Sequence, residues 1–157
     1  MMINGTASTG NTGSRVSTDT LMKRVLKTRQ LDRFINQNET HLEEITLVDY
    51  LKKLCEERKV TASKVIGKAQ IERGYGYQIF RGIRNPSRDK LLQLAFGFHL
   101  TVEEAGKLLL IAGKSPIYPR LKREAVIAWC LKEQLSLRET QEYLGEYGLS
   151  LLGEVEN

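Results

Sequence analysis

Cysteine, proline and histidine are scarce in this chain, and their scarcity argues against several kinds of structure and site. The 157 residues include two cysteines, three prolines and two histidines. Cys55 and Cys130 form no Cys-x-x-Cys pair, which disfavours a disulfide framework or a cysteine-ligated metal and predicts buried free thiols in a reducing cytosol. His41 and His99 stand in no metal-ligand spacing. We therefore predict no metal and no cofactor.

Long apolar runs are also missing. The longest aliphatic run, Leu108 to Ala112, is far too short to cross a bilayer. Residues 1–20 contain no apolar segment of the kind that a secretory signal needs. We expect a cytoplasmic protein that does not enter a membrane.

Groups of side chains suited to catalysis are equally sparse. Adjacent glutamates such as Glu56 and Glu57 point to different sides of a helix, so they do not form an acid–base dyad. The segment Gly74-Tyr75-Gly76 lacks the preceding strand and the other residues of a nucleotide-binding loop. No nucleophile, base and orienting residue can be grouped from the sequence. The sequence therefore predicts that the protein is not an enzyme.

Positive charge, by contrast, is concentrated in the middle of the chain. The net charge is +5; residues 61–120 carry ten basic and four acidic residues, whereas residues 121–157 carry four basic and seven acidic ones. A local basic cluster is typical of a surface that binds phosphates, although a solvated face rich in lysine has the same composition. The cluster between Thr61 and Lys90 consists of Lys64, Lys68, Arg73, Arg81, Arg84, Arg88 and Lys90, against Glu72 and Asp89.

Apolar residues recur at helical spacing, and no segment alternates as a strand does, so the sequence predicts an all-α protein. A leading helix is expected from a cap at Asp19 to about Asn38. Further helices are expected from Thr46, over 62–69, over 72–81, after Ser87, from Thr101 to Gly113, over 121–131 and over 137–147. The expected caps are Thr46, Thr61 and Ser87, with capping boxes at Thr101/Glu104 and Ser136/Glu139.

These patterns divide the chain into four segments. Residues 1–18 are mostly Ser, Thr, Gly and Asn and are predicted to be disordered. Residues 19–45 form the leading helix and a linker, residues 46–113 form a compact helical domain, and residues 114–157 form a C-terminal helical extension.

Residues 60–87, VTASKVIGKAQIERGYGYQIFRGIRNPS, have the order of caps, anchors and turn that a helix-turn-helix requires. Val60, Val65 and Ala69 form the inner face of the first helix, while Ile71 and Ile79 anchor the second. The segment resembles the Cro/C1-type (XRE) helix-turn-helix transcriptional regulators without a gap, and its ending IFRGIRNPS is similar to the close of that family's recognition helix and loop. The resemblance covers Thr46 to about Gly113.

The resemblance implies a five-helix, lambda-repressor-like domain between an N-terminal helix and a C-terminal helical pair. It places Arg73, Tyr77 and Gln78 where the recognition helix meets base edges, and Ser63 and Gly67 where the first helix approaches phosphates. Gln pairs well with adenine and Arg with guanine. The outward residues of helix 72–81 also include Glu72, Tyr75 and Arg81, and those of the following loop are Arg84, Asn85, Ser87 and Arg88.

Four positions depart from the family pattern. Ile66 stands where the family usually has Ala, Gln70 where it often has Gly, and Gly74 and Gly76 lie within the recognition helix. Because Ile66 is larger and Gly76 smaller than the usual residue, we hypothesise that the two exchange sizes across the helix pair.

The sequence predicts a transcriptional regulator that binds double-stranded DNA as a homodimer and reads the major groove with helix 72–81. The alternative is a helix-turn-helix module, or an antitoxin, whose main partner is another protein, bound through the C-terminal helices. Trp129 in those helices suits either core packing or a dimer contact.

Overall fold

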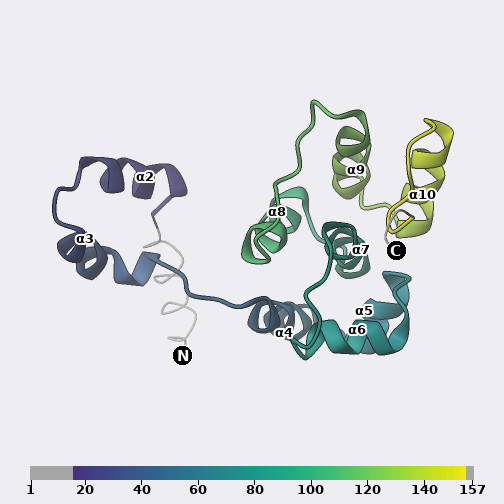
Figure 1. The fold of residues 1–157 in the computed structure, drawn as a ribbon, viewed down its shortest axis with the longest axis horizontal. Coiled ribbons are helices and arrows are strands. Elements are labelled where there is room, and N and C mark those ends of the chain that lie inside the picture. Colours follow the sequence, from purple (N-terminus) through teal and green to yellow (C-terminus); the bar gives the residue numbers. More distant parts are fainter. Residues whose placement is uncertain (1–15, 155–157) are drawn as a thin grey trace, which may run out of the picture. The chain divides into compact units, whose positions relative to one another are not determined.

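The computed structural model describes residues 16–154, and every regular element among them is a helix, which confirms the all-α prediction. Most of the segment predicted to be disordered, residues 1–15, lies outside the described residues. The chain divides into two compact units, Met1–Glu44 and Ile45–Asn157, whose helices are labelled in Figure 1.

The first unit contains α2 (Thr18–Lys27), α3 (Leu31–Asn38) and the short 3₁₀ helix η1 (Glu39–His41). The structure thus divides the predicted leading helix in two. Thr28 and Gln30 adopt extended conformations, and the Thr28 hydroxyl donates to the Gln30 carbonyl. Such a local side-chain bond competes with helix continuation. Ser17, rather than Asp19, caps α2 by accepting from the Thr20 amide.

Few of the described side chains of the first unit are buried. Phe34 and Asn38 of α3 are buried, whereas α2 buries no residue. The Arg24 guanidinium donates to the Asn38 side-chain oxygen, and Asn38 in turn donates to the Phe34 carbonyl. Polar bonds therefore contribute much of the link between α2 and α3.

The described part of the second unit holds seven helices. They are α4 (Leu47–Arg58), α5 (Ala62–Lys68), α6 (Arg73–Phe80), α7 (Arg88–Phe98), α8 (Val102–Ile111), α9 (Lys122–Lys132) and α10 (Leu137–Glu146). The predicted caps Thr46, Thr61 and Ser87 each accept from the backbone amide three residues on. The predicted capping boxes at Thr101/Glu104 and Ser136/Glu139 are both present. These caps explain why the helices begin where they do.

Helix α7 is the centre of the second unit. All its residues from Leu91 to Phe98 are buried, and it packs against α5, α8 and α10 (Figure 1). A Cβ on Gly97 would lie 2.7 Å from the Val65 carbonyl oxygen, so glycine is what lets α5 approach α7 so closely. The buried Gln93 donates to the Ala69 carbonyl at the end of α5.

The C-terminal helices share this core. Ile127 and Leu131 of α9 and Leu144 of α10 are buried in the same cluster as the side chains of α4 to α8. Cys130 is buried and Cys55 half-buried, both as free thiols. Within residues 16–154, no helix has the length and apolar character needed to span a membrane.

Candidate nucleic-acid interface

Helices α5 and α6 pack against each other through a tight turn. Ala69 ends α5, and Gln70 follows in the left-handed conformation with φ of 54°. The next residue, Ile71, is buried and its amide donates to the Ile66 carbonyl, which fixes the turn against α5. Of the predicted inward residues, Val65, Ala69 and Ile79 are buried, and Val60 is half-buried against the same core. Helix α6 is thereby held with one face inward and one face toward solvent.

The outer face of this helix pair carries most of the predicted contact residues. The exposed ones are Ser63, Gly67, Glu72, Arg73, Arg81, Arg84 and Asn85, and the half-buried ones are Tyr75, Tyr77, Gln78 and Ser87. Arg88 is also half-buried but is held against α9 instead. Some of these side chains meet in two clusters, one that joins α5 to α6 around Tyr77 and one that joins α6 to the following loop around Arg84.

One cluster on this face joins α5 to α6. The hydroxyl groups of Ser63 and Tyr77 are hydrogen-bonded, and the Arg73 guanidinium lies 5.8 Å from the centre of the Tyr77 ring. The bond from Ser63, followed by Arg73, lowers the pKa of the Tyr77 phenol because both favour its charged form. Tyr77 is thus held in a defined orientation at the middle of α6.

A second cluster joins α6 to its following loop. Arg84 Nε donates to Gln78 Oε1 at 2.8 Å, and its guanidinium carbon lies 5.6 Å from the centre of the Tyr75 ring. The amides of Ile83 and Arg84 both donate to the Gln78 carbonyl. Gln78 therefore holds the loop by its backbone and holds Arg84 by its side chain.

Two predicted contact residues, Glu72 and Arg88, form hydrogen bonds or ion pairs within the protein through their charged groups. The Glu72 carboxylate caps α6, accepting from the amides of Gly74 and Tyr75 at 2.8 and 2.9 Å. These bonds lower the pKa of Glu72, since they favour the carboxylate. The N-terminus of α6, a position that often binds a phosphate, is thus filled by a side chain of the protein.

Arg88 is held on the opposite side, against α9. Its guanidinium donates to both Glu124 oxygens and to the carbonyls of Ser115 and Pro116. Burial by itself would raise the pKa of Glu124, but the bonds from Arg88 and from the Tyr118 amide outweigh it and lower that pKa. We therefore leave Arg88 out of the candidate surface. Its neighbour Ser87 acts as the cap of α7.

Sequence reasoning missed the two ion pairs that fasten α9 to α7. Glu124 pairs with Arg88, and Arg123 pairs with Asp89 at 3.0 Å. No local signal could have found them, since the partners lie more than thirty residues apart in sequence. They also explain why the charge of residues 88 and 89 does not belong to the outer face.

Five exposed cations remain on and beside this face. They are Lys64, Lys68, Arg73, Arg81 and Arg84. Within the part of the chain that the structure describes, none of them forms an ion pair with a carboxylate. Helix α6 itself contains no acidic residue, and the carboxylate of its cap Glu72 is bonded to backbone amides, so the face is positive and suited to a polyanion.

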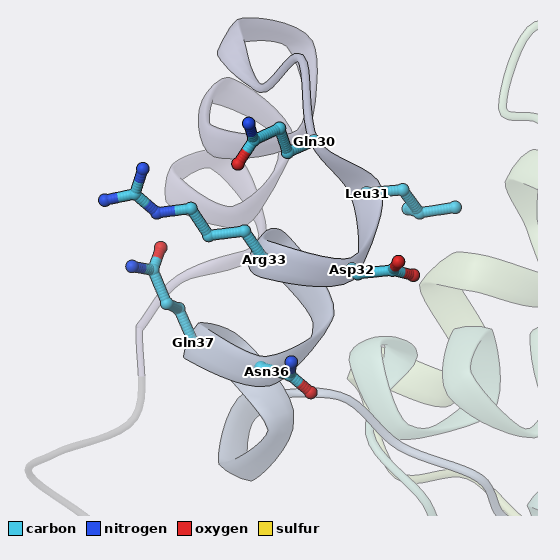
Figure 2. Close-up of a pocket in the computed structure, with 6 residues that line it drawn as sticks. All are labelled: Gln30, Leu31, Asp32, Arg33, Asn36 and Gln37. Atoms are coloured by element: carbon cyan, nitrogen blue, oxygen red, sulfur yellow. The ribbon is translucent and has the colours of Figure 1, made fainter.

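Other parts of the described chain are weaker candidates for a binding site. A hollow of about 630 Å³ in the first unit is lined by residues of α3 and its cap, yet Figure 2 shows Leu31 and Asp32 pointing to one side and Arg33 and Gln37 to another. These side chains do not converge on a common centre. Among residues 16–154 there is also no group of three or more His, Cys, Asp or Glu that could hold a metal ion.

Comparisons of the chain with protein-family models, with curated proteins and with solved structures returned no match.

Proposed function

We propose that α5 and α6 act as a helix-turn-helix of the Cro/C1 type and that the protein binds double-stranded DNA as a sequence-specific transcriptional regulator. The observation that supports this most directly is the outer face of α6 and its loop. That face presents Arg73, Arg81 and Arg84 to solvent without a carboxylate partner among the described residues. DNA phosphates would supply the missing negative charge.

The dimensions of α6 fit this role. An α-helix with its side chains is about 10–12 Å in diameter and the major groove of B-DNA is about 12 Å wide, so the eight-residue α6 can enter the groove. Gln78 and Arg73 carry the groups that pair bidentately with adenine and guanine, respectively. Arg81 and Arg84 would contact phosphates, which adds affinity but carries no sequence information.

The test is a selection of binding sites from random duplex DNA, followed by measurement of affinity over a range of salt concentrations. We expect an enriched sequence and an affinity that falls steeply with salt. Arg81→Ala should weaken binding to all duplexes and reduce the salt slope by about 1. Lys132→Ala is the control, because it removes an exposed cation from α9, which does not belong to the proposed face. Absence of salt-sensitive binding to any duplex would refute the proposal.

A protein partner in place of DNA is the second candidate, and one observation favours it. Gln78 and Arg84, both expected to face DNA, hydrogen-bond each other instead of projecting freely. A helix-turn-helix module that no longer binds DNA would retain the hydrogen bond between Gln78 and Arg84. This candidate predicts one stoichiometric protein partner from the source cells and no enrichment in the DNA selection, so the same experiment separates the two.

A further inference from the structure

The side chain of Arg84 is held against α6 by a hydrogen bond and a ring contact. Arg84 Nε donates to Gln78 Oε1 at 2.8 Å, and the guanidinium carbon lies 5.6 Å from the centre of the Tyr75 ring. Tyr75 and Gln78 are three residues apart, so their side chains lie on the same side of the helix. Arg84 belongs to the loop after α6, yet its charged group is therefore held at the outer face of the helix itself.

The backbone of Arg84 is fixed to the same residue. The amides of Ile83 and Arg84 donate to the Gln78 carbonyl at 2.9 and 3.2 Å. Gln78 thus positions both the main chain and the side chain of Arg84. Because these contacts already restrain it, the guanidinium has little further freedom to lose when it binds a ligand.

The bond to Arg84 also limits what Gln78 can do. A glutamine amide pairs with adenine through both of its ends, since its oxygen accepts from N6 and its nitrogen donates to N7. Arginine has donors but no acceptor, so it is the Gln78 oxygen that faces Arg84. Adenine N6 would compete for that oxygen with a charged donor, whose bond is about twice as strong as a neutral one.

The outer end of the Arg84 side chain remains open. A guanidinium carries N–H groups on Nε, Nη1 and Nη2. Arg84 is exposed, and no acceptor within residues 16–154 bonds either of its Nη groups. Nη1 and Nη2 therefore form a fork of two donors at the end of the side chain that Gln78 does not hold.

Such a fork matches the major-groove edge of guanine. Guanine presents two acceptors there, O6 and N7, and an arginine that donates to both is the commonest base-specific contact. A phosphate can accept the same fork, but phosphates lie along the rims of the groove. Because Gln78 is expected at the base edges in the proposed function, on which this step rests, a guanidinium bonded to Gln78 reaches the same edges.

Side-chain chemistry alone would give Arg84 a phosphate and Gln78 an adenine. We infer instead that Arg84 reads a guanine of the target site through Nη1 and Nη2, and that Gln78 is the positioning residue that holds it there. Tyr75 supports the guanidinium from its ring face.

The test is the selection of binding sites from random duplex DNA with conservative variants of both residues. The wild-type site should contain a guanine whose replacement weakens binding by about tenfold or more. Arg84→Lys keeps the charge but loses the fork, so the preference for that guanine should disappear while the salt slope of the affinity is retained. Arg120→Lys, an exposed arginine of the connector between α8 and α9, is the matched control.

A modified base identifies the contact directly. The analogue 7-deazaguanine lacks the N7 acceptor. Placed at the selected guanine, it should weaken binding of the wild type by about threefold or more and leave binding of Arg84→Lys unchanged. Equal losses in the two proteins would mean that another residue reads this base, and the inference would be wrong.

Variants of Gln78 separate positioning from reading. Gln78→Glu retains an acceptor for Arg84 Nε, so it should keep the guanine preference although its negative charge lowers the overall affinity for DNA. Gln78→Leu removes the acceptor and should relax the preference for the same guanine. If Gln78→Leu relaxed an adenine and left the guanine intact, Gln78 would be the reader and the inference would fail. Circular dichroism checks that each variant keeps its helices.

The outcomes distinguish this inference from the proposed function. A protein that selects no duplex overturns the proposed function, and the role given to Arg84 falls with it. A protein that selects a site without such a guanine, or that keeps the guanine preference in Arg84→Lys, overturns the role of Arg84 alone.

Discussion

A Cβ atom added to Gly76 would lie 2.6 Å from Cγ2 of Ile66, closer than atoms can approach without a shift. The side chain of Ile66 occupies the space that a residue other than glycine at position 76 would fill. The hypothesis that these two positions exchange sizes across α5 and α6 is thus supported by direct contact. Gly76 has no special backbone conformation and serves only to admit its neighbour.

Gly76→Ala should destabilise the protein by about 1–2 kcal/mol, because overpacking costs more than the roughly 1 kcal/mol of helix propensity that alanine adds. In an Ile66→Ala background the clash is absent, and the same change should become stabilising by about 1 kcal/mol. Urea unfolding of the four proteins measures both effects. Gly106→Ala in α8 is the control, since its Cβ would meet nothing within 4 Å. Strict additivity of the two changes would contradict the size exchange.

Gln70 should be replaceable by glycine with a gain in stability. Its φ of 54° lies in the left-handed region, where side chains with a Cβ are strained by about 1 kcal/mol or more. Relief of that strain is partly offset by the greater freedom of glycine in the unfolded chain, so we expect a net gain of ~0.5 kcal/mol. Gln70→Val, with a β-branched side chain, should lose stability. Thermal unfolding of both variants measures the sign, and equal effects would contradict this account.

Gln78 and Arg84 should behave as a coupled pair in DNA binding. Because Gln78 Oε1 accepts from Arg84 Nε, removing either side chain also frees the other. Gln78→Ala should relax base preference at one position and also change the salt slope, which a pure base contact would not do. A double-mutant cycle on DNA affinity should give a coupling of about 0.5–3 kcal/mol. Additive effects would mean that the pair separates before DNA is bound.

Gly67 offers a direct test of close approach to DNA. A Cβ at this exposed position of α5 meets nothing within 4 Å, so Gly67→Ala should fold and gain about 1 kcal/mol of helix propensity. If the DNA backbone passes over this position, the added methyl group should weaken binding to every duplex. Gly145→Ala on α10, equally open, is the control. Unchanged affinity in a stabilised Gly67→Ala protein would remove Gly67 from the interface.

The Arg88–Glu124 pair should make stability fall in acid. The pKa of Glu124 is lowered in the folded protein from its ordinary value of 4.5, so its contribution is complete above that pH and is lost as pH falls through the folded value. Urea unfolding between neutral pH and about pH 3 should show this loss. Glu124→Gln should reduce the loss of unfolding free energy at low pH. Glu142→Gln, which removes an exposed carboxylate from α10, should leave that loss unchanged. If Glu124→Gln lost as much unfolding free energy in acid as the wild type, the role given to the Arg88–Glu124 pair would be wrong.

Local signals account for much of this protein. Thr46, Thr61, Ser87, Thr101 and Ser136 were identifiable as caps from the sequence, because a cap bonds to backbone within three residues. Burial of Val65, Ile71 and Ile79 followed from helical periodicity in the same way. The break at Thr28 was missed, since apolar spacing continues across it and only the local bonds between Thr28 and Gln30 mark the interruption.

Contacts between distant segments decide which charges remain for a partner. Arg88 looked like a phosphate contact in sequence, yet Glu124, which follows it by 36 residues, takes up its charge. Likewise, Asp89 pairs with Arg123, 34 residues further on. Two short-range contacts also use side chains predicted to face a partner, since Glu72 caps its own helix and Arg84 bonds to Gln78. The sequence alone thus determined where α4, α5, α7, α8 and α10 begin and which faces are apolar, because those depend on near neighbours. The surface left open for binding depends on the folded chain, since periodicity and composition do not encode which remote residues meet.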